Sequence, residues 1–270
     1  MKREGFTLIE LLVVIAVIVL MMAILIPVLR IMKLRAEAVE CQNNIKQLFL
    51  RLTMYEDDHG TFPHAFDDTS QEPPPGGFPG NPFYDRVGWW WFNHFIDYSR
   101  KNTDKESVIL CPSKKMNDIR LKKNVLCGNY GMNLSICKNS MGRISQTEFV
   151  GTPLSSTNIQ QPSRSLLVMD SGYSMISWWH VTGIPPAPLV GLKNEVEAYV
   201  PGLEMNEEKF LGPDQKYDAI MGRHPKKKVN VGYVDGHIDS KKAKELFVEK
   251  TETGYNNHYP LWRTIKNNND

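Results

Sequence analysis

The sequence predicts an α+β fold in which a long N-terminal α-helix packs on an antiparallel β-sheet head domain with large loop insertions. Three observations support this prediction. Residues 11–29 form an uncharged apolar run, apolar residues recur every three or four positions in residues 41–55, and strand-like alternation surrounds Asp235 and Gly236. The first two patterns are typical of one continuous helix, and the third is typical of a hairpin. Segments rich in proline and glycine, such as residues 71–83, predict the loops.

The apolar run is long enough to cross a membrane as a helix. At about 1.5 Å per residue, residues 11–29 span a hydrocarbon core of roughly 30 Å. Glu10 lies at the start of the run, and a charged side chain at the centre of a membrane helix costs about 2.5–3.5 kcal/mol on insertion scales. We therefore expect Glu10 to have a partner.

Two simpler explanations of the run account for less. An ordinary secretory signal has a shorter apolar region and a cleavage site of small residues, which Ile-Leu-Ile-Pro at residues 24–27 does not offer. A plain membrane anchor explains the length, but it explains neither Glu10 nor the Gly5-Phe6 pair that precedes the run.

The second part of the helix is predicted to be amphipathic, with an apolar stripe facing the head domain. Gly60 is a favourable C-terminal cap, so we expect one helix from Phe6 to about His59. The chain then divides into a leader (1–5), a transmembrane half-helix (6–29), an amphipathic half-helix (30–60) and a head domain (61–270). The members of the stripe are Cys41, Ile45, Leu48, Leu52 and Tyr55.

The head domain is expected to contain short strands and to end in a hairpin and a helix. Strand candidates are residues 108–112, 128–133, 165–172 and 177–180. In the hairpin, Asp235-Gly236 is predicted to form a two-residue type I′ turn, whose central residues both need φ > 0. Residues 241–250 are predicted to form the C-terminal helix, with Ser240 as its cap.

Two tryptophan-rich segments, residues 89–95 and Trp178-Trp179, allow two interpretations. Aromatic side chains can form a platform for a glycan or a protein, but they more often build a core. We favour the core for residues 89–95, in a helix with Trp91 and Phe95 inside.

Charge and cysteine content exclude some classes of function. The net charge is +2 and the charges are interspersed, so nothing indicates nucleic-acid binding. No C-x-x-C occurs, which disfavours a zinc knuckle or a thioredoxin-like motif. In an exported head domain three disulfide pairings are open, and our first choice joins Cys111 and Cys127, which flank a basic stretch. The cysteines are Cys41, Cys111, Cys127 and Cys137.

Metal-ligand residue types occur near the hairpin, namely His224, Asp235, His237 and Asp239. The turn explains Asp235 without a ligand, so we expect no metal there. Calcium has oxygen donors available but no EF-hand spacing to support it. No nucleophile elbow, phosphate loop, dinucleotide fingerprint or H-E-x-x-H motif occurs, so we expect neither an enzyme nor a cofactor. The acidic candidates for calcium are Glu207, Glu208, Asp214, Asp235 and Asp239.

The segment Gly5-Phe6-Thr7-Leu8-Ile9-Glu10, with Pro27 farther along the helix, resembles the class III signal of type IV pilins and type II secretion pseudopilins. The resemblance implies a pilin-like fold, cleavage after Gly5 by a membrane-embedded prepilin peptidase, and methylation of the new N-terminus on Phe6. It also implies that Glu10 pairs with the Phe6 amine, in its own or a neighbouring subunit, and sets the register of assembly. Pro27 removes a backbone hydrogen bond, so a kink or local melting is expected near Ala23.

The C-terminal region resembles that of a large subfamily of pseudopilin-like proteins that carry a His-x9-Asp-Gly motif. His224, Asp235 and Gly236 correspond to this motif, although ten residues instead of nine separate the histidine from the aspartate and Lys226-Lys227 replaces a glycine pair. The resemblance assigns no role to these residues. Other segments that fit the subfamily are residues 41–48 (Cys-Gln-Asn-Asn-Ile-Lys-Gln-Leu), Cys111-Pro112, residues 130–133 (Tyr-Gly-Met-Asn) and Pro162-Ser163 before the Asp170 strand.

The resemblance implies a structural subunit of the cytoplasmic membrane, with its N-terminus inside and its head periplasmic or extracellular. Its partners would be the prepilin peptidase, other pilin or pseudopilin subunits and the assembly platform of a secretion or pilus machinery. Charge alone does not choose this orientation, because basic residues lie on both sides of the span. A secretion pseudopilus and a pilus remain open, and the alternative is a membrane-anchored or filament-tip module that binds a glycan or exported cargo through its aromatic surface.

Overall fold

The structure is a computed structural model of the 270-residue chain. It describes residues 7–69, 88–94, 108–114, 126, 128–140, 147–172, 174–177, 198–199, 223–226, 228–246, 248–251, 254–256 and 259–264.

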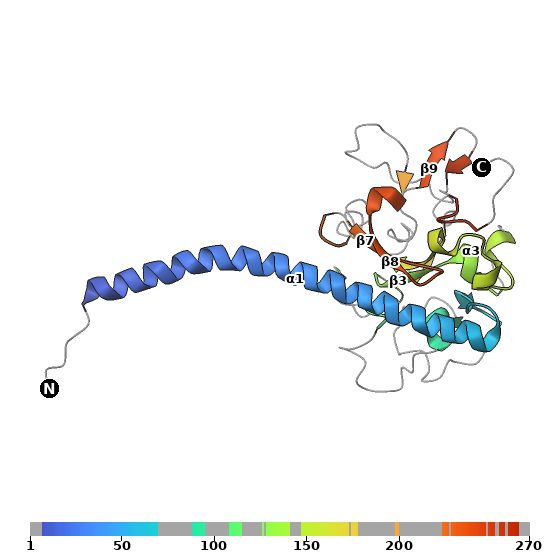
Figure 1. Cartoon of the computed structure of the whole chain (residues 1–270), viewed down its shortest axis with the longest axis horizontal. Helices are drawn as coiled ribbons and strands as arrows, with labels where there is room; N and C mark the ends of the chain where they lie inside the picture. The colour runs from blue at the N-terminus through green and yellow to red at the C-terminus, as the bar shows by residue number, and fades with distance from the viewer. Residues whose placement is uncertain are drawn as a thin grey trace.

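The fold begins with the long helix α1 (Leu8–His59), whose first half projects away from the head and whose second half lies along it (Figure 1). The Thr7 side chain caps its first turn, and Gly60 ends it in the left-handed conformation with φ 79°. The predicted C-terminal cap is therefore confirmed. The helix starts at Leu8, and the predicted first residue, Phe6, lies outside the described residues. The helix continues without interruption through Pro27, so the local melting expected near Ala23 is not found.

The two halves of α1 have different environments. Large apolar side chains between Leu8 and Met32 are exposed, and this half is long and apolar enough to cross a membrane. In the second half, the predicted stripe is confirmed: its first four members are fully buried against the head and Tyr55 is partly buried. The buried members are Cys41, Ile45, Leu48 and Leu52.

The head is built on a five-stranded sheet with the order β5-β3-β4-β7-β8. Its pairs are antiparallel except β3 with β5, which is parallel, so the sheet is mixed and not fully antiparallel as predicted. Helix α1 packs on β7 and β8. The strands are β3 (Tyr130–Asn133), β4 (Leu166–Asp170), β5 (Met175–Ile176), β7 (Lys228–Tyr233) and β8 (Ile238–Lys242).

The close approach of α1 to the sheet depends on a glycine in β7. A Cβ atom on Gly232 would lie 2.8 Å from Cγ2 of Ile45 and 3.0 Å from Cγ1 of Val168. Because the interior is close-packed, a larger residue there would push the helix away from the strands.

Smaller elements complete the head. A second sheet has the order β10-β9-β6, and β1 pairs with β2. Short helical turns connect the strands, and the predicted large loops lie mostly outside the described residues. These elements are β1 (Phe66–Asp67), β2 (Trp89–Trp90), η1 (Trp91–His94), α3 (Leu134–Cys137), η2 (Thr147–Phe149), η3 (Ser156–Asn158), η4 (Pro162–Arg164), β6 (Ala198–Tyr199), η5 (Ala243–Leu246), β9 (Val248–Thr251) and β10 (Gly254–Asn256).

Strand predictions from local pattern were partly right. The strands expected in residues 128–133 and 165–172 are confirmed as β3 and β4. The strand expected in residues 108–112 is wrong, because this segment forms turns and the backbone N–H of Cys111 donates to the Asn129 side chain instead of to a strand. Of the candidate at 177–180, residues 178–180 lie outside the described residues.

The predicted C-terminal helix at residues 241–250 is wrong. Strand β8 continues to Lys242, which is opposite Lys228 of β7, and β9 pairs with β6. Between them, one 3₁₀ turn buries Ala243 and Leu246. The apolar spacing that suggested a helix is thus satisfied by a single turn between two strands.

The predicted hairpin is confirmed, but its turn is longer than expected. The Tyr233 N–H donates to the His237 carbonyl at 3.0 Å, and the Gly236 N–H donates to the Tyr233 carbonyl at 2.9 Å. Within this three-residue loop, only Gly236 has a left-handed φ, at 85°. A type I′ turn needs two such residues, so that prediction was wrong. The extra loop residue is Val234, which is buried and whose N–H donates to the Ser165 carbonyl.

The aromatic segment contributes to the core, as predicted. Trp90, Trp91 and Phe92 are buried, although they occupy a strand end and a 3₁₀ turn instead of a helix. These side chains therefore offer no platform for a ligand. Trp178 and Trp179 lie outside the described residues.

Candidate functional site

The first site is the N-terminal end of α1. Gly5 and Phe6 lie outside the described residues, but the first turn of the helix shows where Glu10 is held. Its Oε2 accepts hydrogen bonds from the backbone N–H and the hydroxyl of Thr7, each at 2.8 Å. The Thr7 Oγ1 in turn accepts from the Glu10 N–H at 3.3 Å. This is a capping box, in which two unpaired donors of the helix end are satisfied reciprocally.

Glu10 therefore has a partner within its own chain, Thr7, which sequence reasoning did not identify. The signal was available, because Thr7 followed by Glu10 at the start of an apolar helix is the spacing of a capping box. The acidic side chain also lies at the positive end of the helix dipole, which stabilises it.

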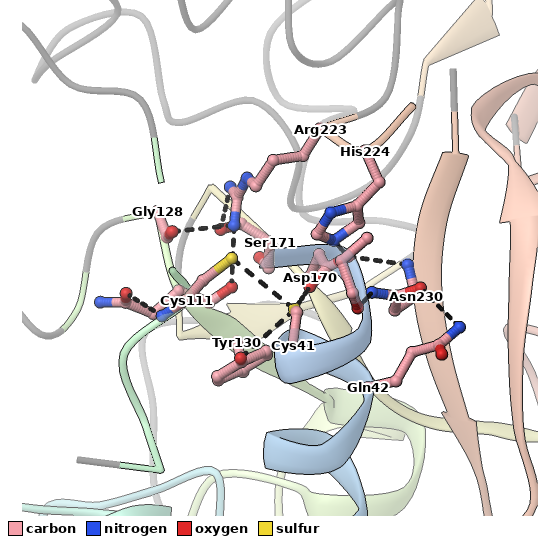
Figure 2. Close-up of polar contacts among 12 residues, drawn as sticks. Cys41, Gln42, Cys111, Gly128, Tyr130, Asp170, Ser171, Arg223, His224 and Asn230 are labelled. Carbon is pink, nitrogen blue, oxygen red and sulfur yellow. Dashed lines mark hydrogen bonds and ion pairs between the residues drawn. The ribbon is translucent and has the colours of Figure 1, made fainter. Parts of the chain in front are cut away.

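The second site is a buried cluster of four side chains. Cys41, Cys111, Asp170 and His224 each place one potential ligand atom within 4.8 Å of the others. Figure 2 shows these side chains converging from helix α1, the turn at Cys111, the end of β4 and the segment before β7. All four residues are less than 5% exposed. Among the described residues, no other such group of three or more His, Cys, Asp or Glu occurs.

The contacts within the cluster are short. The sulfurs of Cys41 and Cys111 are 3.7 Å apart. The Cys41 thiol donates to Oδ1 of Asp170 at 2.7 Å, and Nε2 of His224 lies 2.7 Å from Oδ2 of the same carboxylate. Asp170 is therefore the centre of the cluster, with a thiol on one oxygen and an imidazole on the other.

A shell of hydrogen bonds orients these four side chains. The Tyr130 hydroxyl donates to the Cys41 sulfur at 3.3 Å, and the Asn230 N–H donates to Oδ2 of Asp170 at 2.7 Å. The Asn129 side chain accepts from the Cys111 N–H at 3.0 Å.

The Asn230 side chain also donates to the Ala38 carbonyl and accepts from Gln42, so the same strand residue joins the cluster to α1 (Figure 2).

Arg223 supplies positive charge beside the cluster. Its guanidinium donates to the carbonyls of Gly128, Asn129 and Ser171 at 2.8–3.2 Å, and the residue is 7% exposed. These bonds tie the start of β3 to the end of β4 and fix the guanidinium in place (Figure 2).

The electrostatics of the cluster follow from burial and from this arrangement of charges. Burial raises the pKa of Asp170, but the charge and hydrogen bond of His224, with Arg223, outweigh it and leave the pKa below its usual value. Burial lowers the pKa of His224, but Asp170 outweighs it and the net shift is upward. Asp170 and His224 therefore form a buried ion pair.

The two thiols differ in acidity. Burial raises the pKa of Cys111, but the hydrogen bond with Cys41 and the positive charge of Arg223 outweigh it and lower the pKa to about 7. Burial, with Cys111 and Asp170, raises the pKa of Cys41 well above its usual value. Cys111 is thus the more acidic sulfur.

His224 and the Asp235-Gly236 turn, to which the sequence assigned no role, occupy different places in the structure. His224 lies in the interior with Asp170, whereas Asp235 accepts from the His237 ring and N–H at 2.5 and 3.1 Å on the exposed turn. Asp239 pairs with Lys241 at 3.1 Å. The metal-ligand types Asp235, His237 and Asp239 thus do not form a three-ligand group among the described residues. Three of the acidic calcium candidates, Glu207, Glu208 and Asp214, lie outside the described residues.

Gly236 has a separate role at the contact between the turn and α1. Lys46 donates to its carbonyl at 2.9 Å, and a Cβ atom there would overlap the Phe49 ring. The Asp-Gly turn therefore docks on the helix.

The expected Cys111–Cys127 disulfide is not formed. Cys111 carries a free thiol, as do Cys41 and Cys137, and Cys127 lies outside the described residues. Cys111 is close to Cys127 in the sequence, but folding brings its sulfur to Cys41 of the helix.

Sequence reasoning missed Cys41 and Asp170 as members of a site. A signal was present: the segments quoted for the His-x9-Asp-Gly resemblance include Cys41, Cys111 and His224, and Pro162-Ser163 lies shortly before the strand that ends at Asp170. That these segments meet in one place follows only from the fold.

Comparison with known proteins gives a match for the N-terminal residues of the chain. Residues 1–26 match the family model described as the prokaryotic N-terminal methylation motif. No match was found among curated proteins or among solved structures. The match lies on the leader and on the exposed apolar half of α1. Together, the methylation motif and the long apolar N-terminal helix that carries it support a type IV pilin-like protein.

Proposed function

We propose that the chain is cleaved after Gly5, methylated on Phe6 and assembled through α1 into a type II secretion-type pseudopilus or a pilus. The observation that carries this proposal is the first half of α1, which bears the methylation motif and projects away from the head (Figure 1). Its apolar side chains are exposed along its whole length. The head would be periplasmic or extracellular, and the leader cytoplasmic.

The exposed apolar side chains of this half-helix require an apolar environment. Burial of apolar surface contributes about 25 cal/mol per Å², so a helix that exposes large side chains from Leu8 to Met32 is unfavourable in water. Lipid satisfies this surface before assembly, and the helices of neighbouring subunits satisfy it in a filament. The same apolar surface would thus hold the subunit in the membrane before assembly and bind neighbouring subunits in the filament.

Glu10 would provide the register. Its Oε2 is held by Thr7 in the single chain. Cleavage after Gly5 would create an amine on Phe6, directly before Thr7, and a charge-assisted bond from an amine to a carboxylate is stronger than a neutral one. In a filament, the amine of a neighbouring subunit would bind Glu10 and select one axial position.

The experiment is assembly in cells that contain the peptidase and the assembly platform. Glu10→Val should be cleaved as the wild type is, but should be lost from sheared filaments or from crosslinked subunit ladders. Glu37→Gln changes an acid on the same helix outside the apolar half and is the matched control. If Glu10→Val enters filaments as efficiently as Glu37→Gln, the register role is wrong. A bulky residue at Gly5 should block cleavage, and normal maturation of that variant would contradict the cleavage position.

A further inference from the structure

We propose that Cys41, Cys111, Asp170 and His224 bind one zinc ion, which fastens α1 to the head. This inference is independent of the assembly proposal, because the cluster lies in the head-facing half of the helix.

The donor atoms suit zinc. Two sulfurs, one imidazole nitrogen and one carboxylate oxygen are the atoms that zinc binds in proteins, and four protein ligands with no open position are typical of structural sites. Calcium and magnesium prefer oxygen ligands alone, so the two thiols disfavour them. The burial of all four residues excludes a substrate from the ion.

The spacing of the sulfurs also fits. Zn–S bonds of about 2.3 Å in a tetrahedral site hold two sulfurs about 3.8 Å apart, and the Cys41 and Cys111 sulfurs are 3.7 Å apart. Asp170 lies closer to its neighbours, at 2.7 Å from both the Cys41 sulfur and His224 Nε2, because these are hydrogen bonds. Zinc would replace these two bonds, with release of the thiol protons and of the proton shared by Asp170 and His224. The carboxylate would move away from both neighbours.

The charges balance when zinc is bound. Two thiolates and one carboxylate carry three negative charges, and Zn²⁺ with the Arg223 guanidinium carries three positive charges. Three backbone carbonyls hold the Arg223 guanidinium beside the cluster, so its positive charge stays next to the ion. Buried charges are tolerated when they are compensated in this way.

The surrounding hydrogen bonds match those that orient metal ligands. Tyr130 donates to the Cys41 sulfur and Asn230 donates to the Asp170 carboxylate. Donors of this kind hold ligands in position and adjust their basicity. They are also bonds that a thiolate and a carboxylate can accept when they coordinate an ion.

A Cys41–Cys111 disulfide is the competing use of the two sulfurs. Their separation would permit it after a small movement, and an exported head domain is exposed to oxidising conditions. A disulfide, however, uses only two of the four converging groups. Zinc uses all four, so we commit to zinc.

The experiment starts with the full chain purified in detergent micelles, without added chelator. We expect one zinc per chain by elemental mass spectrometry. X-ray absorption at the zinc edge should show two sulfurs at about 2.3 Å and two nitrogen or oxygen ligands at about 2.0–2.2 Å. A chelator should lower Tm, and ZnCl2 should restore it, because a ligand that binds only the folded state stabilises it.

Variants locate the ion. Cys41→Ser, Cys111→Ser and His224→Gln should each lower bound zinc at least tenfold. Cys137→Ala, at a buried free thiol outside the cluster, and His237→Gln, at an exposed histidine, should retain one zinc per chain. Full zinc content in all three cluster variants would contradict the proposal.

The wild-type measurements keep the proposal falsifiable even if a cluster variant fails to fold. A reduced wild-type chain that takes up no zinc during titration with ZnCl2 overturns it. So does a chain isolated from its native compartment with a Cys41–Cys111 disulfide and no zinc.

Discussion

Nε2 of His224 lies 2.7 Å from Oδ2 of Asp170, and this buried pair joins the segment before β7 to the end of β4. The histidine and the Asp235-Gly236 turn, which are close in the sequence, therefore do different things. His224 organises the interior, whereas Asp235 and Gly236 shape an exposed turn that docks on α1. A spacing of ten residues instead of nine between them does not disturb either role.

The first prediction concerns Asp170. Asp170→Asn should reduce the free energy of unfolding by about 3–5 kcal/mol, because it removes one partner of a buried ion pair. The measurement is chemical denaturation of the zinc-free full chain in detergent, in which the ion pair is present. The control is Asp239→Asn, which breaks a partly exposed pair with Lys241 and should cost less than about 1 kcal/mol. Equal losses for the two variants would show that the Asp170 pair does not stabilise the head.

The second prediction compares two glycines with nearly the same backbone angle φ. Gly60 and Gly236 have φ of 79° and 85°, so alanine strains both by about 1–2 kcal/mol. A Cβ atom at Gly60 meets nothing within 4 Å, whereas at Gly236 it overlaps the Phe49 ring. Overpacking costs a further 1–3 kcal/mol or so. Gly236→Ala should therefore be the more destabilising variant in denaturation experiments.

A second substitution tests the cause of that difference. In a Phe49→Ala background, Gly236→Ala should cost no more than Gly60→Ala, because the ring that the new methyl group meets is gone. If the cost of Gly236→Ala stays the same in both backgrounds, contact with α1 does not explain the need for glycine in the turn.

The third prediction tests the packing of α1 on the head. Leu48→Ala should destabilise the head by about 2–5 kcal/mol, because it leaves a cavity in the core. Leu50→Ala, two residues later on the same helix, should change stability by about 0.5 kcal/mol or less. Leu48 is fully buried and Leu50 is 54% exposed, and the residue type is the same. Similar effects of the two changes on the denaturation midpoint would contradict the observed orientation of the helix.

The fourth prediction is a pH dependence. Burial, helped by the nearby His59 and His64 and opposed by Asp67, lowers the pKa of His94 from 6.5 to about 4. The unfolded chain therefore takes up the proton first, and stability should fall as pH drops from about 6.5 to 4, by up to about 3 kcal/mol. Above pH 6.5 both states are neutral at this site, and the dependence vanishes.

His94→Phe isolates this contribution. Phenylalanine keeps an aromatic ring beside Tyr55 and Trp89 but does not titrate. The difference in unfolding free energy between wild type and variant should change between pH 6.5 and 4 and stay constant above. A constant difference over the whole range would show that His94 is protonated normally in the folded head.

The helix was the most predictable part of the structure. Its stripe of Cys41, Ile45, Leu48 and Leu52 and its stop at Gly60 were read correctly, because helical period and capping are local properties of the sequence. The C-terminal segment was misread, because Ala243 and Leu246 have helical spacing, while pairing of Lys242 with Lys228 decides the conformation. Such pairing depends on a distant strand and leaves no local trace.

The buried cluster could not be assembled from local pattern. Cys41 belongs to a helical stripe, Cys111 to a turn, and Asp170 ends a strand, so each residue has a separate local explanation. Only the register of β4 with β7 and the packing of α1 on the sheet bring them to His224.

Maturation of this chain as a pilin-type subunit is the step on which the proposed function depends. The most direct test is the mass of its N-terminal peptide after co-expression with a prepilin peptidase. We expect a peptide that begins with Phe6 and carries one additional methyl group. A peptide that retains Gly5, or one that begins beyond Glu10 after cleavage inside the apolar helix, would contradict it.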